Sequence, residues 1–264
     1  MIKLSAIIIT LNEEEKIGAC LDSLRGVADE IVVVDSFSTD KTEALCRGHG
    51  VRFMQHAFEG YVEQIRHAVD QAAYPFVFSI DADEALSPTL RESILEVKKD
   101  FQADAYSCNR LNHLCGSPVK HGAWYPDRKI RLWKKVRGEY GGINPHYQVI
   151  MAHGSNIDFL KGDLLHYSYD SMEELFLQAG KFATITANEL HRKGRRVTLA
   201  GVLFRPMLRF MRDYLLKAGV LDGFPGLLIA GSSVYNNFLK YARLYHLNST
   251  ARPTGGRPGG PACA

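Results

Sequence analysis

The chain has 264 residues, of which 46% are hydrophobic and 23% are charged, as in an ordinary globular protein. The net charge of +3 is too small to favour nucleic acid as a partner. No stretch reaches the roughly 18 uncharged apolar residues of a membrane-spanning helix. The cysteines lack CxxC spacing, which disfavours a zinc site and indicates reduced thiols in a cytoplasmic protein; they are Cys20, Cys46, Cys108, Cys115 and Cys263.

Strand and helix signals alternate through the first hundred residues. Apolar residues recur at helical spacing between short β-branched runs, as at Val62, Ile65 and Val69. We therefore expect an α/β fold with a parallel, doubly wound sheet. The short runs predict strands at Lys3–Thr10, Glu30–Asp35, Val51–Gln55 and Phe76–Ile80. The first shows little alternation, which predicts burial on both faces.

Two helix starts carry capping signals. Asp40 and Glu43 are three residues apart and resemble a capping box. Ser87 is the expected N-cap of another helix, because Pro88 follows it at the first helical position.

The fourth predicted strand ends in an acidic motif, Asp81-Ala82-Asp83. Ligands of an open α/β sheet bind beyond the carboxyl ends of its strands. Mg²⁺ and Mn²⁺ prefer oxygen ligands, usually one or two carboxylates together with substrate phosphates. The chain lacks a GxGxxG fingerprint after its first strand and a P-loop lysine. We expect a cation at this motif to hold phosphates, and we interpret Glu84 as a helix-start charge.

Several further motifs occur in a fixed order around this one. Together they resemble a family 2 glycosyltransferase of the GT-A fold, and within it the branch that builds the lipopolysaccharide core, including its β-1,4-glucosyltransferases. The resemblance extends from Lys3 to Leu247. The motifs are Ile8–Glu14, Val32–Asp40, Ser79–Glu84, Trp124–Lys129, His166–Tyr169 and Gly219–Gly223.

The resemblance implies a Rossmann-like GT-A sheet, a nucleotide-sugar donor and Mg²⁺ or Mn²⁺ as the cofactor. Asp83 is expected to bind the metal on the donor diphosphate. His166 is expected to be a second metal or diphosphate ligand, with a buried structural histidine as the alternative. The residues expected to contact the nucleotide sugar are Thr10, Asn12, Glu13, Asp35, Arg66 and Asp81. For Asp35, a turn or cap role is the alternative.

Aromatic and basic residues follow on the expected acceptor side. The rings of Trp124 and Tyr125 suit a sugar, although they can instead cover the sheet. Arg128 and Arg131 belong to a basic run that is either a solvated edge or a site for diphosphate or an anionic acceptor. We favour them as anion ligands because guanidinium binds phosphate bidentately. Strands are predicted on both sides, at Ala103–Leu111 and Lys129–Trp133.

An inverting transferase needs a base that takes the proton of the acceptor hydroxyl. Relatives carry an acid directly after the histidine of the segment Asn144-Pro145-His146-Tyr147, so Tyr147 stands where a carboxylate is expected. Tyrosine, with a pKa near ~10, is a poor base at neutral pH. His146 is our first candidate for the base and Asp127 the second. The alternative is a catalytically impaired protein that binds nucleotide sugars.

The last third of the chain is predicted to be helical and basic. One helix is expected over Ser171–Arg192, with Ser171 and Glu174 as a capping box. Between Arg192 and Lys217 there are eight basic residues and one acid. Apolar residues such as Phe204 share one face there, and arginines share another. This composition suits a helix in the interface of an anionic membrane, and the alternative is a helix packed on the domain with its basic face exposed.

The sequence thus predicts a GT-A domain over residues 1–170, with a nucleotide-sugar half (1–100) and an acceptor half (101–170). A helical, membrane-associated segment (171–249) and a Gly- and Pro-rich disordered tail (250–264) follow. The expected activity is inverting transfer from a nucleotide-diphosphate sugar, UDP-hexose by default, to a lipid-linked or lipopolysaccharide-core saccharide. The expected location is the inner face of a bacterial cytoplasmic membrane. A sugar nucleotidyltransferase is disfavoured because Leu11–Lys16 is not a Gly-rich basic loop.

Overall fold

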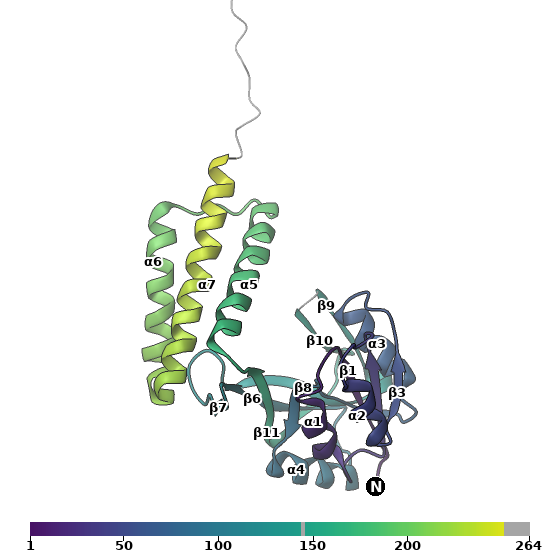
Figure 1. Cartoon of the computed structure of the whole chain (residues 1–264). Coiled ribbons are helices and arrows are strands. Elements are labelled where there is room, and N and C mark those ends of the chain that lie inside the picture. Colours follow the sequence, from purple (N-terminus) through teal and green to yellow (C-terminus); the bar gives the residue numbers. More distant parts are fainter. Residues whose placement is uncertain (144–145, 251–264) are drawn as a thin grey trace, which may run out of the picture. The chain divides into compact units, whose positions relative to one another are not determined.

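The computed structural model describes residues 1–143 and 146–250, without the side chains of residues 143 and 146. The chain divides into two compact units (Figure 1). Unit 1 comprises Met1–Lys120 and Trp124–Asp170, and unit 2 comprises His121–Ala123 and the chain from Ser171 onward. The tail predicted to be disordered lies, from residue 251, outside the described residues.

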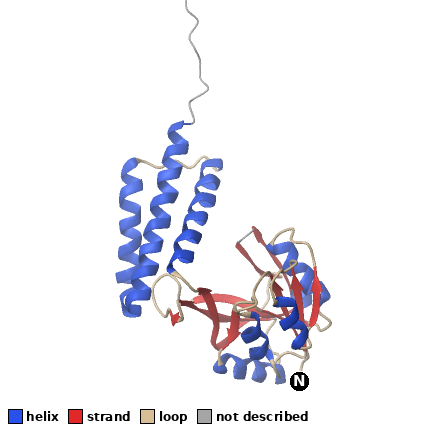
Figure 2. Ribbon diagram, in the orientation of Figure 1, coloured by secondary structure: helices blue, strands red, loops and turns tan. Residues whose placement is uncertain are grey.

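Unit 1 begins with alternating strands and helices. Figure 2 shows its strands together with the helices that flank them. Its first strands pair in parallel in the order β3-β2-β1-β4, which confirms the predicted parallel sheet. The elements are β1 (Leu4–Thr10), α1 (Ile17–Leu24), β2 (Glu30–Asp35), α2 (Thr42–Gly48), β3 (Arg52–Gln55), α3 (Tyr61–Gln71), β4 (Phe76–Ser79) and α4 (Pro88–Lys99).

The sheet then becomes mixed. β8 (Asp127–Lys134) runs antiparallel to both β4 and β6 (Ala105–Leu114). β11 (Ile157–Tyr169) is parallel to β6, and the short β5 (Glu84–Leu86) lies antiparallel to β11. The register of that last pair sets Glu84 opposite His166, which brings the Asp81-Ala82-Asp83 motif to β11. The remaining parts are β7 (Ser117–Pro118) on β6, the 3₁₀ turn η1 (Lys135–Arg137), and the hairpin of β9 (Gly138–Ile143) and β10 (His146–Met151).

Both faces of β1, β2 and β4 are largely buried, as their apolar runs predict, whereas the edge strand β3 is half-exposed. Ala6 and Ile8 of β1 join one hydrophobic cluster with Leu21 of α1. Ile7, between them in sequence, joins the opposite cluster with Ile65 of α3. Side chains alternate between the faces of a strand, and each fully buried aliphatic side chain contributes about 1.5–3 kcal/mol.

Two of the three predicted caps are present. The Oγ of Ser87 and that of Ser171 each accept a hydrogen bond from the amide three residues on, at 3.2 and 3.1 Å. The capping box at Asp40 is wrong, because α2 begins without a side-chain cap. The Asp40 carboxylate instead accepts from the amides of Thr42 and Glu14, at 2.9 and 3.0 Å, and so joins two loops beside β1 and β2.

Unit 2 is helical, and α7 lies between α5 and α6 (Figure 1). Its elements are α5 (Met172–Arg192), α6 (Leu199–Phe210), which continues into the π-helical η2 (Met211–Leu216), the 3₁₀ turn η3 (Gly219–Asp222) and α7 (Gly223–Thr250). Among the described residues, no single helix has the length and apolar composition to cross a membrane. The segments Leu199–Leu216 and Gly219–Thr250, bent by 71°, meet that criterion only as a pair.

Candidate active site

A cavity of about 410 Å³ opens beyond the carboxyl ends of β1 and β4, where ligands of such sheets bind. It brings together Thr10, Glu13, Asp81, Asp83 and His166, which the sequence singled out as donor or metal residues. Its other lining residues are Ile9, Leu11, Ser36, Phe58, Tyr61, Ala82 and Tyr147.

Asp83 and His166 form the polar centre of this cavity. The Oδ2 of Asp83 lies 3.1 Å from the Nε2 of His166. The β5–β11 pairing fixes this approach, since the amide of Tyr167 also donates to the Asp83 carbonyl at 3.0 Å. Two predicted metal residues that are far apart in sequence are thus neighbours.

The other ring nitrogen of His166 is held by Asn112 of β6. The Nδ2 of Asn112 donates to the carbonyl of Trp124 at 3.0 Å, so its Oδ1 is the atom that faces the imidazole, 2.6 Å from Nδ1. An amide oxygen only accepts, and therefore Nδ1 carries the hydrogen. In the neutral ring Nε2 then has the free lone pair, the arrangement typical of a metal-binding histidine.

Unpartnered buried oxygens also point to a polar ligand. The Oδ1 of Asp81 and the Oγ1 of Thr10 are buried and have no hydrogen-bond partner among the described residues. Buried polar atoms are rarely left without a partner. Burial, together with the negative charge of Asp83, raises the pKa of Glu13 in the same cavity to about 7. The cavity therefore has oxygens for sugar hydroxyls and excess negative potential for a cation.

Asp83 and His166 fit a divalent metal ion. They offer one carboxylate oxygen and one imidazole nitrogen on the same cavity wall. Within residues 1–143 and 146–250, no group of three or more His, Cys, Asp and Glu side chains is arranged for a metal. Mg²⁺ and Mn²⁺ commonly take few protein ligands and complete their shell with phosphate oxygens and water, so a diphosphate donor would supply the rest.

Asp81 is held from behind by a buried ion-pair group. The Nη2 of Arg131 lies 2.6 Å from the Oε1 of Glu84 and 3.2 Å from the Oδ2 of Asp81. The Oε2 of Glu84 accepts from the Asp81 amide at 2.9 Å. Arg131 keeps the pKa of Asp81 below its ordinary value despite burial, which raises it. Asp81 therefore stays ionised with one oxygen free.

This group corrects two expectations. Glu84 is not a helix-start charge but a strand residue of β5 that is 1% exposed. Arg131 is not on a solvated edge, since it is 5% exposed and its guanidinium is taken up by two carboxylates. Its predicted role as an acceptor ligand thus gives way to a role in fixing the Asp81 loop.

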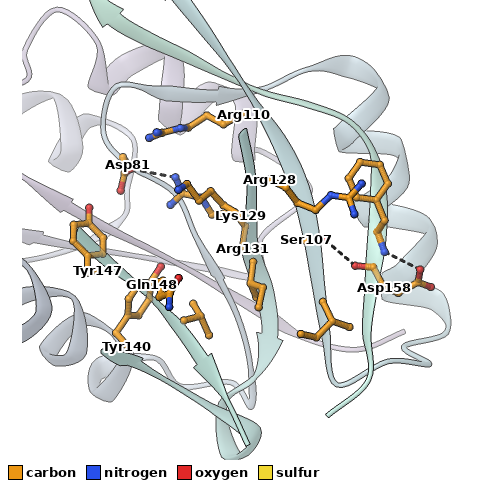
Figure 3. A pocket seen from close by; sticks show the side chains of 14 residues that line it. Asp81, Ser107, Arg110, Arg128, Lys129, Arg131, Tyr140, Tyr147, Gln148 and Asp158 are labelled. Carbon is orange, nitrogen blue, oxygen red and sulfur yellow. Dashed lines mark hydrogen bonds and ion pairs between the residues drawn. The ribbon is translucent and has the colours of Figure 1, made fainter. Parts of the chain in front are cut away.

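A second cavity, of about 720 Å³, adjoins the first and shares Asp81 and Tyr147 with it. Figure 3 shows Arg110, Arg128 and Lys129 along one part of it, with Asp81 and Tyr147 across from them. Its other lining residues are Ser107, Ile130, Arg131, Tyr140, Gln148, Val149, Ile157, Asp158 and Phe159.

Arg128 is the least committed cation of this second cavity. Its guanidinium lies 4.4 Å from the ring centroid of Phe159, and no carboxylate lies within ion-pair distance in the described part of the chain. Lys129 and Arg110 both pair with Asp127, at 3.2 and 2.7 Å. Of the two arginines predicted to bind an anion, Arg128 is therefore the one whose guanidinium is still available.

Tyr147 stands at the boundary of the two cavities. Burial and the charge of Asp81 raise its pKa far above the ordinary range, so its hydroxyl stays protonated at neutral pH. Its ring stacks on that of Tyr61 at 5.7 Å, and Tyr61 in turn meets Phe58 at 5.1 Å. Tyr147 therefore forms part of the wall of both cavities, and a hydroxyl that keeps its proton is a poor base.

Residues 5–158 match the family "Glycosyl transferase family 2". The chain is also 33% identical to the lipopolysaccharide core biosynthesis glycosyltransferase LpsC of Rhizobium meliloti (strain 1021), over 257 residues that cover 95% of each protein. The chain is a family 2 glycosyltransferase. The α/β fold with C-terminal helices that the GT-A resemblance implies is confirmed.

Other matches are more distant. An uncharacterized glycosyltransferase of Rickettsia typhi, RT0209, is 28% identical over 262 residues, which cover 96% of this chain and 90% of the relative. The structure of S. aureus TarS with UDP matches 95% of this chain and 93% of its own, at 17% identity and a TM-score of 0.44. Glucosyl-3-phosphoglycerate synthase from Mycobacterium tuberculosis, with Mn²⁺, UDP-glucose and phosphoglyceric acid, covers 42% of this chain and 44% of its own, at 22% identity and a TM-score of 0.36. No residue role follows from these structural matches.

Three predicted donor residues of this glycosyltransferase lie outside the lining of either cavity. Asp35 is fully buried, and its two oxygens accept from the amide and hydroxyl of Ser38, at 2.8 and 2.5 Å. The Oδ1 of Asn12 accepts from the amide of Thr39 at 2.8 Å. The Nε of Arg66 donates to a carbonyl of β9 at 2.6 Å. In this structure Asp35 and Asn12 hold loops, Arg66 links α3 to β9, and the contacts of all three with the donor stay predictions.

The aromatic pair and the second candidate base of the family 2 enzyme are also engaged elsewhere. Trp124 packs against Tyr169, with ring centroids 5.8 Å apart. The hydroxyl of Tyr125 donates to Asp163 at 3.0 Å. Burial raises the pKa of Asp127, but Arg110 and the neighbouring lysine outweigh it and lower the pKa below its ordinary value. Asp127 is therefore a weak base, and the side chain of His146 lies outside the description.

Sequence reasoning missed several residues of the glycosyltransferase site. Asn112 orients His166 only because β6 and β11 pair with these two residues in register. Phe58 and Tyr61 line the first cavity, and Arg110 lines the second. A Phe and a Tyr flanking Gly60 before a helix were a usable signal, because such aromatics suit stacking on a ligand ring. Asn112 and Arg110 could not be found in this way, because their positions depend on pairing between strands that are distant in sequence.

Proposed function

We propose that this family 2 glycosyltransferase transfers a sugar, with inversion, from a nucleotide-diphosphate sugar to a lipid-linked or lipopolysaccharide-core saccharide. UDP-hexose is the default donor, and Mg²⁺ or Mn²⁺ the cofactor. The proposal rests on one observation: the Asp83–His166 pair lies in a cavity that shares Asp81 and Tyr147 with a larger, basic cavity. A donor in the first and an acceptor in the second meet at Asp81. The name of the relative LpsC supports the class of acceptor.

The side chains of the first cavity bind and orient the donor. Phe58, Tyr61 and Tyr147 form an aromatic wall on which a nucleotide base stacks. Asp81, kept ionised by Arg131, accepts a hydrogen bond from a sugar or ribose hydroxyl through its free Oδ1. A metal ion on Asp83 and His166 would supply Lewis-acid neutralisation of the departing diphosphate.

Inversion requires the acceptor hydroxyl to attack the anomeric carbon from the side opposite the diphosphate. A new carbon–oxygen bond forms to the acceptor while the bond to the diphosphate oxygen breaks. The acceptor proton passes to a base, for which His146 stays our first candidate. Tyr147 keeps its own proton, and Asp127 is held by cations.

Unit 2 is proposed to rest on the cytoplasmic face of an anionic membrane. Its α6 helix exposes large apolar side chains, among them Phe204 at 61% and Met207 at 63%. Arginines lie beside them, and this combination is typical of interfacial helices.

A thermal-shift screen tests the donor and the metal together. UDP-, GDP-, ADP- and CMP-sugars are compared with and without Mn²⁺. A donor at about 100 times its dissociation constant adds about 2.7 kcal/mol, or about 5 to 11 °C for a chain of this size. Asp83→Asn should lose the Mn²⁺-dependent shift, and the control Asp70→Asn, an exposed acid of α3, should keep it. Absence of any shift in the wild type, or a full shift in Asp83→Asn, contradicts the proposal.

A second candidate function is a module that binds nucleotide sugars without transferring them. It is favoured by Tyr147, which stands where a carboxylate base is expected. Calorimetric binding of UDP and Mn²⁺ beside a labelled-sugar transfer assay separates the two. Binding without transfer to any lipid extract favours the module.

A further inference from the structure

The α6 helix and its π-helical extension η2 turn their apolar side outward. Phe204, Met207 and Leu208 are 61%, 63% and 68% exposed. These positions recur at helical spacing, so they form one face. Burying such surface is worth about 25 cal/mol per Å², and a large exposed apolar face marks an interaction surface. The same face of these elements also exposes Leu199, Leu203, Met211, Leu215 and Leu216.

The basic face of the same helix turns toward α7 instead. There, three arginines and residues of α7 line a cavity of about 430 Å³. All of it lies within unit 2. The lining residues are Arg205, Leu208, Arg209, Arg212, Asn237, Lys240 and Tyr241.

Positive charge in this cavity exceeds negative charge. Asp213 pairs with Arg209 and, at 2.8 Å, with Arg212. Arg205 and Lys240 lie on the ring of Tyr241, 4.7 and 4.6 Å from its centroid, and no carboxylate of the described chain is within ion-pair distance of either. Four cations thus face one carboxylate.

The cations destabilise one another. Burial lowers the pKa of Lys240, and the positive charges of Arg209 and Arg205 also lower it, although the contact with Tyr241 opposes the shift. A bound anion would remove this repulsion. Guanidinium groups match the oxygens of a phosphate bidentately, which favours a phosphate over a single carboxylate.

We propose that this cavity binds the terminal phosphate of an anionic lipid headgroup, with Arg205, Arg212 and Lys240 as its ligands. The exposed face of α6 then rests on the acyl boundary beside it. Leu208 belongs both to that face and to the cavity lining, so the two surfaces are continuous. This continuity with an apolar face and the charge complementarity favour a lipid phosphate over a soluble one. The inference rests on the membrane contact proposed above, but not on sugar transfer.

The test measures binding of the full chain to vesicles. Phosphatidylcholine vesicles carry either phosphatidic acid, whose phosphate is terminal, or phosphatidylserine, at matched surface charge. The variant Arg205→Gln/Lys240→Gln is compared with Arg195→Gln/Arg196→Gln, which removes two exposed cations elsewhere in unit 2. The melting temperatures of both variants are measured to check that they fold.

The wild type and the control variant should prefer phosphatidic acid by at least about tenfold, the factor for 1.4 kcal/mol of charge-assisted hydrogen bonding. The cavity variant should lose this preference. Equal preference in all three proteins, or none in the wild type, overturns the headgroup site.

Two other occupants of this surface give distinct results. A site for free phosphate would bind inorganic phosphate in calorimetry without discriminating between the vesicles, and that result overturns the proposal. A second copy of the chain on the apolar face would appear as a dimer in sedimentation that binds no vesicles, which overturns it as well. Donor binding by thermal shift is read in the same preparations. If the wild type shows no donor binding but keeps its preference for phosphatidic acid, the proposed sugar transfer is contradicted and the headgroup site is not.

Discussion

Arg131→Met is expected to be among the most destabilising substitutions near the active site. Its guanidinium lies 2.6 and 3.2 Å from the carboxylates of Glu84 and Asp81, and all but 5% of the residue is buried. At an effective dielectric constant of about 20, these two contacts are worth about 6 and about 5 kcal/mol before desolvation. Removing one partner of such a group costs about 3–5 kcal/mol, because the other charges stay buried without compensation. For a chain of this size, that is a fall in melting temperature of about 6 to 20 °C.

Urea denaturation followed by tryptophan fluorescence measures this loss, since Trp133 is fully buried on the same strand. Arg128→Met is the matched control, because Arg128 is an exposed arginine of β8 with a ring contact and no described carboxylate partner. It should change stability by less than about 1 kcal/mol. Equal losses in both variants, or less than about 1 kcal/mol in Arg131→Met, would refute the reasoning.

The loss should also depend on pH. Burial and the charge of Asp81 already raise the pKa of Glu84 to about 7, although Arg131 opposes the shift. Without Arg131 the pKa rises further. A carboxyl whose folded-state pKa is raised stabilises the fold at low pH and loses that contribution as the pH rises. Arg131→Met should therefore lose less stability near pH 6 than near pH 8.

His146→Gln is expected to lower kcat by about 10²–10⁴-fold in a labelled-sugar transfer assay, and Tyr147→Phe by less than about threefold. Gly162→Ala sets a Cβ 2.9 Å from a Cα of α4 at φ +90°, and should cost at least about 2 kcal/mol in urea denaturation. Burial raises the pKa of Asp29, but hydrogen bonds led by Lys98 outweigh it, and the pKa is lowered. The stabilisation by Asp29 is therefore complete above pH of about 4 and lost below it, a step that Asp29→Asn should remove from the pH dependence of unfolding.

Each of these expectations has a contrary outcome. A Tyr147→Phe enzyme as slow as His146→Gln would contradict the assignment of the base to His146 alone and give Tyr147 a part in proton transfer. An unchanged urea midpoint for Gly162→Ala would mean that β11 moves away from α4 at no cost. An acid unfolding step retained by Asp29→Asn would assign that step to another carboxylate.

The parallel half of the sheet was readable from the sequence because its signals are local. Runs such as Ala6–Ile8 and Val32–Val34 are apolar without alternation, and only a strand covered on both faces buries such a run completely. The caps at Ser87 and Ser171 depend on three neighbouring residues and were also readable. Asp40 carries the same local signal, yet its carboxylate accepts a hydrogen bond from the amide of Glu14, which lies in a loop distant in sequence.

The site was only partly readable because its geometry depends on strands that are distant in sequence. Asp83 and His166 were found through their motifs, but the pairing of β5 with β11 brings them together. Glu84 was misinterpreted because its partner, Arg131, lies 47 residues further on. Local spacing carries no information about an antiparallel β8 beside β4, and so Arg131 was predicted to be an anion ligand within a basic run. The phosphate site proposed for unit 2 likewise depends on α6 packing against α7.

The metal dependence of sugar transfer tests the Asp83–His166 site most directly. The measurement is incorporation of labelled sugar from UDP-hexose into a lipopolysaccharide-core acceptor, with Mn²⁺ or with a chelator, for the wild type, Asp83→Asn and the control Asp70→Asn. We expect transfer by the wild type and the control with Mn²⁺, none with the chelator, and a loss of at least about 10²-fold in Asp83→Asn. Full transfer in the presence of the chelator, or by Asp83→Asn, would contradict a metal-assisted transferase at this site.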